Sequence, residues 1–443
     1  MTVLFSNPPW MDYSDPKASR CGIRAGSRWP HTIPMPYAPG EFQPARKYLP
    51  YPFFLGYAAT YAEKHTTDTE ILFRDSIARH ETYSQFYTYL LTKKPDLIFI
   101  ECATPSWEHD KALIGRIKEL IPGARLAVTG TLSSVRSAEI LDTPGVVAAI
   151  KGEYEKNAVK VIQGAEGVLE HDLLTEAEMN ASPFPWYDQA TARNYWDCNP
   201  RGMVFPHAQV WTSRGCMYKC QFCVWPAVMT GNDPDGLHKR SVRFYSPEYM
   251  EAYLAEIVGK YGFRSVYFDD DTMNLSDRHT VAMCKVMRKL NLPWSAMCRA
   301  DTSSREVWKE MKASGCYGVK IGFETGSQRV MDQIINKKLD VKEAEETGKF
   351  LTSIGMSWHG TFMTGTPGST AAEDAETLAL IERCKTHGMQ SYQLSGMAVH
   401  DGTPADTLVR SGGQAMKAYP GAKLDERFVN MSDGNKKAEL SKA

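Results

Sequence analysis

Short apolar runs alternate with amphipathic stretches of helical length in two long regions of the chain. Within residues 1–165 the apolar runs are VLFS, EILF, DLIFIECA, RLAVTG and VVAAIKG, separated by segments such as FFLGYAATYAEKH. Within residues 206–410 the runs are AQVWTS, SVYFDDD, WSAMCRA, GVKIGFE, SWHGTFMTG and SYQLSGM. Strands that alternate with helices build parallel sheets covered by helices. The sequence therefore predicts an α/β protein with two such regions.

The two regions predict two domains. Residues 1–165 are expected to form a Rossmann-like domain, whose ligands would lie beyond the carboxyl ends of its strands. Residues 206–410 hold six strand–helix units, which fit a partial (β/α)6 TIM barrel better than a closed eightfold one. Residues 166–205 lose the periodicity and contain several prolines, as a linker does.

Two other segments are irregular. The insertion CGIRAGSRWPHTIPMPYAPGEF follows the first predicted strand, and we expect it to fold over a ligand or a neighbouring domain. The polar residues 411–443 are expected to form a short, frayed C-terminal segment.

Net charge and hydropathy limit the kinds of molecule that the protein is expected to bind. The formal net charge of -1 offers no general attraction to nucleic acid or to an anionic membrane. The first residues, MTVLFSNPPW, lack the features of a secretory signal, and no apolar run is long enough to span a membrane. We expect a cytoplasmic protein that acts on a small molecule.

Three of the ten cysteines cluster. Cys216, Cys220 and Cys223 stand in the sequence TSRGCMYKCQFCVWP, directly after the first apolar run of the second region. A structural zinc site needs four ligands and usually shows a second matched pair, which this sequence lacks. Three thiolates suit an iron–sulfur cluster with one iron open to a ligand. The alternatives are a zinc knuckle and three buried core cysteines.

This CxxxCxxC loop, with the aromatic Phe222 before its last cysteine, resembles that of the radical S-adenosylmethionine (SAM) superfamily. The resemblance implies a 4Fe-4S cluster on the three cysteines, SAM chelated to the open iron, and contact of Phe222 with the cofactors. Reductive cleavage of SAM would release methionine and a 5'-deoxyadenosyl radical that abstracts hydrogen from the substrate. Such chemistry needs an electron donor such as flavodoxin or ferredoxin, or a partner reductase.

Two charged residues after later strands fit the same resemblance. Asp270 in YFDDDTMN lies where family members carry a segment that contacts the SAM amino group, and Arg299 in CRAD is placed to pair with a carboxylate such as that of bound methionine. The alternative for Asp270 is a helix cap. The alternative for Arg299 is a salt bridge to Asp301 or to a neighbouring strand.

Two further motifs extend the resemblance. GFETGS resembles a family segment through which Glu324 would contact SAM by its ribose or amino group. MTGTPGST matches a family turn near adenine, in which Gly365 and Pro367 would set the shape of the backbone.

Four residues are candidates for the catalytic acid and base. Strand alternation points Asp269 and Asp271 to the same side of the second barrel strand. His359 and His400 titrate near neutrality and are further candidates, although a single histidine is more often a core or surface residue.

The first domain, with its RAGSRWP insertion and Gly152-Glu153 after its last strand, resembles the cobalamin-binding-domain subfamily. Most members of that subfamily pass a methyl group from cobalamin to a substrate carbon radical. Two features argue against cobalamin here: the loop Gly130-Thr131-Leu132-Ser133, where cobalamin binders often have paired glycines, and a chain that ends soon after the barrel. Both favour an architecture like diol dehydratases of the apramycin type, which keep the domain without using cobalamin.

The sequence hypothesis is therefore a radical enzyme of aminoglycoside or aminosugar biosynthesis that dehydrates a 1,2-diol to a deoxy ketone. The alternative is a cobalamin-dependent methyltransferase that acts on an sp3 carbon of a natural product. A redox or iron sensor is a third possibility, which GFETGS and MTGTPGST disfavour because a sensor has no need of a SAM-shaped cavity.

Overall fold

The computed structural model describes residues 1–10, 49–79, 81–195, 204–231, 233–397 and 399–411, and the backbone of two short strands, β2 (Arg20–Cys21) and β3 (Thr32–Ile33). The chain divides into two compact units: Met1–Asp197 with Val228–Asn232, and Cys198–Ala227 with Asp233–Ala443. Apart from β2 and β3, the CGIRAGSRWPHTIPMPYAPGEF insertion lies outside the described residues. So do residues 196–203 of the expected linker and 412–443 of the C-terminal segment.

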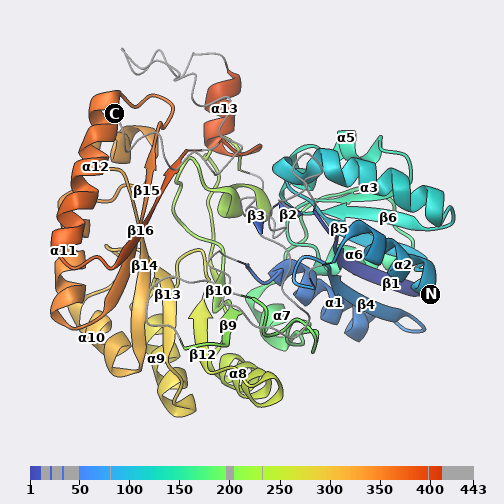
Figure 1. Ribbon diagram of the computed structural model, residues 1–443, viewed down its shortest axis with the longest axis horizontal. Helices are drawn as coiled ribbons and strands as arrows, with labels where there is room; N and C mark the ends of the chain where they lie inside the picture. The colour runs from blue at the N-terminus through green and yellow to red at the C-terminus, as the bar shows by residue number, and fades with distance from the viewer. Residues whose placement is uncertain are drawn as a thin grey trace. The chain divides into compact units, whose positions relative to one another are not determined.

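The first unit contains a six-stranded sheet in which every pairing is parallel (Figure 1). Its strand order is β4-β1-β5-β6-β7-β8. Since the chain moves from β1 to β4 on one side and then to β5 on the other, the carboxyl ends of β1 and β5 flank a topological switch point. The strands are β1 (Thr2–Asn7), β4 (Glu70–Asp75), β5 (Leu97–Glu101), β6 (Arg125–Thr129), β7 (Val146–Ile150) and β8 (Gly167–Leu169).

Helices cover both faces of this sheet because its strands are apolar on both sides. On one face Leu4, Ile98 and Ile100 pack with the apolar sides of two helices, while on the other the rings of Phe5 and Phe99 stack at 4.5 Å. The helices of the unit are α1 (Phe53–His65), α2 (Tyr83–Lys93), α3 (Trp107–Leu120), α4 (Thr131–Val135), α5 (Ser137–Leu141), α6 (Glu155–Ile162), α7 (Glu176–Ala181) and the 3-10 turn η1 (Thr104–Ser106).

The second unit contains another six-stranded, wholly parallel sheet, in the order β16-β15-β14-β13-β12-β9. Each strand of this sheet neighbours the sheet strand that precedes or follows it along the chain, as in a TIM barrel cut short at six strands. The strands are β9 (His207–Val210), β12 (Ser265–Phe268), β13 (Trp294–Cys298), β14 (Cys316–Glu324), β15 (Ser357–Thr364) and β16 (Ser391–Gly396).

The helices of the second unit run along the outside of this sheet (Figure 1). Each of the six α-helices described in this unit begins at a Ser, Thr or Asp side chain that accepts a hydrogen bond from the first turn, so the chain enters each helix at a fixed residue. The helices are α8 (Pro247–Tyr261), α9 (Asp277–Leu290), α10 (Arg305–Ala313), α11 (Val341–Ser353), α12 (Ala371–Thr386) and α13 (Pro404–Arg410). Shorter elements are β10 (Ser213–Arg214), β11 (Arg243–Phe244) and the π-helical turns η2 (Trp225–Met229) and η3 (Val330–Ile334).

These two sheets confirm the predicted fold class. The six strands of the barrel coincide with the six apolar runs, and α1 spans the FFLGYAATYAEKH segment. The expected linker contains regular structure: Gly167–Leu169 pairs with β7 as the sixth strand of the first sheet, and α7 follows it. The apolar run at Gly167–Leu169 is too short to show a periodic pattern, and it becomes a strand because it pairs with β7. None of the described helices combines the length and the apolar character needed to cross a bilayer.

Candidate functional site

The cysteine loop follows β9 and β10 at the carboxyl edge of the barrel sheet. It turns at Gly215, whose φ of 88° lies in the left-handed region open to glycine. Cys216 and Cys220 are buried, and Cys223, of intermediate exposure, donates its backbone N–H to the carbonyl of Cys220 at 3.2 Å. The loop therefore presents three free thiols on one short segment, and Phe222, partly exposed, lies within it.

The spacing of the three sulfurs bears on which metal they suit. A zinc ion bound at about 2.3 Å from each thiolate holds the sulfurs about 3.8 Å apart. Among the residues that the structure describes, the three cysteines are not a group whose ligand atoms all lie within 4.8 Å of one another. The loop therefore does not have the sulfur spacing of a single zinc ion, and three thiolates with a fourth coordination position open suit an iron–sulfur cluster.

The charges around the thiols differ from one cysteine to the next. Burial raises the pKa of Cys216 to about 11, and the carboxylate of Asp271 adds to the rise. Burial and then Asp271 also raise the pKa of Cys223. At Cys220 burial raises the pKa, but the positive charges of Lys337 and Arg299 oppose it. Since metal ligation needs thiolates, loading a cluster releases protons from this loop.

Asp270 holds the segment that leads into the cysteine loop. Its carboxylate accepts hydrogen bonds from the backbone N–H (3.0 Å) and hydroxyl (2.8 Å) of Thr212 and from the hydroxyl of Ser213 (2.5 Å). Burial raises its pKa to about 6, against the lowering effect of these bonds. The side chain predicted to touch SAM thus lies against the base of the cysteine loop, where it positions the loop.

Arg299 is buried at the end of β13 and makes the salt bridge that was the alternative to ligand binding. Its guanidinium donates to both carboxylate oxygens of Asp301 (2.8 and 2.7 Å) and to the carbonyl of Lys337 (3.0 Å). Its face lies 3.7 Å from the centroid of the Tyr218 ring, inside the cysteine loop. One nitrogen, Nη1, has no hydrogen-bond partner and remains available to a ligand.

Glu324 lies at a distortion of β14. Its φ of 63° is unusual for a residue other than glycine, and the register with β15 shifts at this position. Its Oε1 accepts a hydrogen bond from the buried ammonium of Lys337 at 2.6 Å. Backbone strain of this kind clusters at ligand sites, and the contact of Glu324 with SAM stays a prediction.

A charged side chain, that of Asp374, holds the turn that contains Gly365 and Pro367. The N–H of Gly365 donates to the carboxylate of Asp374 at 3.0 and 3.1 Å, and φ is positive at Gly365 and Gly368. Pro367 is buried. The shaping of an adenine site by these two residues stays a prediction.

The four acid–base candidates lie in different surroundings. Asp271 is near the thiols of Cys216 and Cys223, whereas buried Asp269 faces His207, whose lowered pKa it opposes. His359 is the third residue of β15, deep in the sheet, with Nδ1 2.9 Å from the hydroxyl of Ser391. Burial lowers the pKa of His400, beyond β16, to about 4. The structure does not bring the four together, and Asp271 is the one placed beside the cysteine loop.

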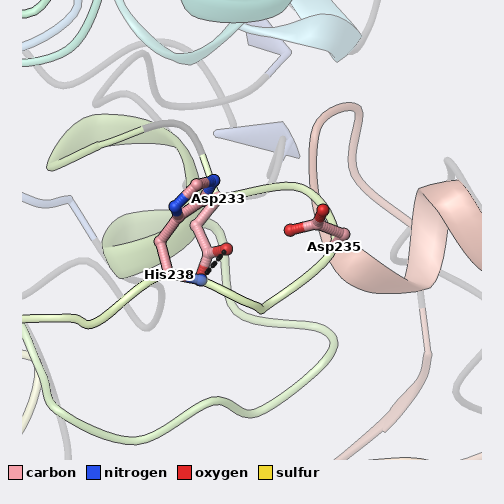
Figure 2. A group of neighbouring side chains, drawn as sticks. All are labelled: Asp233, Asp235 and His238. Carbon is pink, nitrogen blue, oxygen red and sulfur yellow. Dashed lines mark hydrogen bonds between the residues drawn. The ribbon is translucent and has the colours of Figure 1, made fainter.

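A separate group, Asp233, Asp235 and His238, has ligand atoms within 4.8 Å of one another (Figure 2). The Asp233 carboxylate already accepts hydrogen bonds from the His238 backbone at 3.0 Å and from Arg240 at 2.9 Å. These contacts close a turn, and the buried pair with Arg240 neutralises the one buried acid of the group. We therefore assign the group a structural role.

In the first unit, three buried polar atoms belong to the last two residues of β1 and to Trp10, which follows this strand. Within the described residues, Ser6 Oγ, Asn7 Oδ1 and Trp10 Nε1 are buried and make no hydrogen bond. An unpaired buried polar group costs about 1–3 kcal/mol, so such a set is expected where a ligand completes it. These atoms lie at the edge where the sheet order reverses, and their donors and acceptor suit a polar ligand such as the cobalamin that the subfamily resemblance implies.

The loop Gly130 to Ser133 differs from its sequence interpretation. Leu132 is wholly buried in the hydrophobic core of the first unit, and it does not obstruct the ligand edge. The Ser133 hydroxyl donates to the carbonyl of Val128 at 3.1 Å, and Gly130 lies so close to Cys102 that a Cβ there would collide with its backbone. The objection to cobalamin from a bulky leucine therefore does not hold.

Sequence reasoning missed the residues that hold the cysteine loop from outside. Ile335 accepts a hydrogen bond from the backbone of Gln221 at 2.9 Å, and the amide of Asn336 donates to the carbonyl of Lys219 at 3.2 Å. Arg240 donates to the carbonyl of Tyr218 at 2.8 Å. Ile335 and Asn336 belong to the short run INKK after a helical segment, and this run by itself does not indicate a contact with the cysteine loop.

Comparisons with known proteins agree with this picture. Residues 211–381 match the family model of the radical SAM superfamily. The chain is 24% identical over 355 residues to an uncharacterised methyltransferase of Pyrococcus horikoshii, covering 75% of this chain and 73% of the relative. It is 23% identical over 381 residues to the cytidylyl-2-hydroxyethylphosphonate methyltransferase of Streptomyces wedmorensis, covering 72% and 69%.

Two solved structures share the fold. The cobalamin-dependent SAM radical enzyme OxsB with aqua-cobalamin bound has a TM-score of 0.63 at 15% identity, covering 82% of this chain. This chain spans 59% of the length of OxsB. The radical SAM methyltransferase TsrM of Kitasatospora setae, with cobalamin and a [4Fe-4S] cluster bound, has a TM-score of 0.62 at 15% identity, covering 82% and 73%.

Proposed function

The chain carries a radical SAM domain over residues 211–381 and is an enzyme, and from this premise we propose that it is a cobalamin-dependent methyltransferase acting on a small molecule. The cofactors of the radical SAM family are a 4Fe-4S cluster and SAM. The proposal takes up the alternative hypothesis from the sequence in place of the aminoglycoside diol dehydratase.

One observation carries the proposal. A single chain joins the three-cysteine barrel loop to a parallel-sheet unit in which three buried polar atoms at the switch-point edge have no partner among the described residues. Two relatives named as methyltransferases and the fold of the methyltransferase TsrM support methyl transfer, and OxsB and TsrM, which share the fold, both bind cobalamin. The dehydratase hypothesis has no such support, and its argument from Leu132 is removed by the burial of that side chain.

The residues of the barrel have distinct tasks in this account. Cys216, Cys220 and Cys223 would hold the cluster. When bound, the cluster supplies the electron for reductive cleavage of SAM, and cobalamin supplies the methyl group. Asp270 fixes the entry to the cysteine loop, and Glu324 offers a carboxylate at the strand end where a SAM hydroxyl or amino group is to be held.

Product analysis tests the proposal. Protein reconstituted anaerobically with iron, sulfide and hydroxocobalamin is reduced in the presence of SAM whose methyl group carries deuterium. Candidate substrates are cytidylyl-2-hydroxyethylphosphonate, by analogy with the Streptomyces relative, and aminosugar pseudodisaccharides. A methyltransferase yields S-adenosylhomocysteine, 5'-deoxyadenosine and a substrate heavier by one labelled methyl group.

The other outcomes identify the competing functions. Loss of water from a substrate, with 5'-deoxyadenosine but no S-adenosylhomocysteine, would establish the dehydratase. Cluster-loaded protein that cleaves no SAM with any substrate would point to the sensor. The triple variant C216A/C220A/C223A is the matched control and should form neither SAM product.

A further inference from the structure

Lys337 is a buried cation at the carboxyl edge of the barrel. It follows η3 in the chain and its side chain is about one-twentieth exposed. Its ammonium donates to Oε1 of Glu324 and to the carbonyl of Gly322, both at 2.6 Å. Removing an ammonium from water costs free energy, which a carboxylate and a carbonyl offset only when their geometry is well fixed. The surroundings of Lys337 therefore hold its charge in a defined position.

The same short segment holds the cysteine loop on both sides of Cys220. The backbone N–H of Gln221 donates to Ile335, and the side chain of Asn336 donates to Lys219. The carbonyl of Lys337 itself accepts from Arg299, whose guanidinium stacks on Tyr218 of the loop. Lys337 is thus tied both to the strained Glu324 and to the loop that carries the thiols.

The charges at the loop are arranged unequally. Lys337 is the strongest of the positive charges that oppose the effect of burial on the pKa of Cys220, and the carboxylate of Glu324, its ion-pair partner, has a weaker effect in the opposite direction. Cys216 and Cys223 have instead the carboxylate of Asp271 as their main charged neighbour. A cluster on three thiolates becomes more negative when it is reduced, and a fixed positive charge beside it stabilises that reduced form.

We propose that Lys337 is a positioning residue for the radical reaction: it holds the Glu324 carboxylate for SAM and, by its charge beside Cys220, raises the reduction potential of the cluster. This inference rests on the proposed function, because it requires the cluster. It adds to that function a residue that links the SAM-facing carboxylate to the electron-accepting centre.

The test is a potentiometric titration of the reconstituted protein, followed by the electron paramagnetic resonance signal of the reduced cluster. In K337Q the side chain keeps a hydrogen-bond donor and loses its charge, whereas K337R keeps the charge. The matched control is K338Q, because the neighbouring Lys338 is exposed and its ammonium donates to the carbonyl of Asp332.

K337Q should make reduction less favourable on the order of tenfold, which is a shift of about 59 mV to lower potential for a one-electron couple. K337R should stay near the wild-type potential, and K338Q should equal it. K337Q should also weaken SAM binding roughly tenfold in equilibrium dialysis, because Glu324 loses its fixed partner.

The outcomes separate this inference from the function beneath it. Wild-type protein that holds no cluster overturns the proposed function and this inference with it. A cluster-loaded K337Q with wild-type potential and SAM affinity overturns this inference alone. If K337Q holds no cluster, K337R decides: a loaded K337R supports the need for charge, and an empty K337R overturns the electrostatic role.

Discussion

The guanidinium of Arg299 lies 3.7 Å from the centroid of the Tyr218 ring, which joins the end of the third barrel strand to the middle of the cysteine loop. The same guanidinium makes two hydrogen bonds to Asp301. A planar fork that stacks and chelates at once is a property of arginine that lysine lacks. Arg299 therefore acts through the loop as well as by its charge.

Replacing Arg299 should loosen the cysteine loop. R299K keeps the charge but loses the fork and the stacking, and we expect a loss of about 1–2 kcal/mol in unfolding free energy. R299M also leaves Asp301 without its partner and should cost about 3 kcal/mol. Urea unfolding of the apo-protein measures both, and iron content after reconstitution should fall in the same order.

The control for this prediction is R305K. Arg305 also stacks on an aromatic ring, that of Phe350 at 4.3 Å, but its hydrogen bond is exposed and distant from the loop. A change below about 0.5 kcal/mol with full iron content is expected there. Equal effects of R299K and R305K would show that the Tyr218 contact has no special role.

Asp75 should make the stability of the first unit depend on pH. It is buried, accepts hydrogen bonds from Asn7 and Tyr195 at 3.0 Å, and burial raises its pKa to about 6. Because the folded-state pKa lies above the unfolded value, the folded protein retains the proton between about pH 4 and 6 while the unfolded chain has lost it. Stability from this group is therefore present at low pH and is lost as the pH rises through about 6.

The variant D75N removes this titration. The free energy of unfolding of the wild type, minus that of D75N, should fall by about 2 kcal/mol between pH 4 and pH 7. Urea unfolding at several pH values gives this difference. A difference that is constant over that range, or that rises, contradicts a raised pKa.

The buried polar side chains of Ser6, in β1, and of Trp10, which follows β1, should affect ligand affinity more than they affect the stability of the fold. S6A and W10F each remove a buried polar group that has no partner among the described residues. The apo-protein should be unchanged or up to about 1 kcal/mol more stable, because an unsatisfied group is removed. Hydroxocobalamin affinity, measured by equilibrium dialysis, should fall severalfold in both. Undiminished affinity in both would remove these atoms from the ligand edge.

Gly326 of the GFETGS segment lies so close to the backbone of α12 that no residue with a Cβ fits there. A Cβ at this position would collide with the backbone of Glu376 and Thr377 in α12. G326A should therefore destabilise the protein by about 2–3 kcal/mol. G259A is the matched control, since Gly259 is exposed in α8 with open space around it and alanine there should stabilise by up to about 1 kcal/mol. Thermal unfolding of the pair measures the contrast.

The sequence predicts the barrel well because its strands are buried on both faces. Ser265–Phe268 and Cys316–Glu324 stand out as apolar runs between amphipathic helices, and the spacing of the cysteines identifies the loop that follows the first strand. Local patterns carry this information. The direction of Leu132 and the stacking of Arg299 on Tyr218 depend on tertiary packing, which no local pattern specifies.

The residues missed by the sequence act across long separations. Lys337 reaches Glu324 from 13 residues away, and Asn336 reaches Lys219 from 117 residues away. Such contacts follow from the arrangement of strands in the barrel. A polar run after a helix gives no sign of them, since exposed lysines such as Lys338 look the same in sequence.

The central claim is that one chain holds both a cluster and a corrin, and cofactor content after anaerobic reconstitution tests it most directly. Iron, sulfide and hydroxocobalamin are added, unbound material is removed, and iron and the visible spectrum of the corrin are quantified per chain. The account predicts about four iron atoms and about one corrin, with C216A/C220A/C223A keeping the corrin and losing the iron. A protein with full iron content and no retained corrin would contradict it.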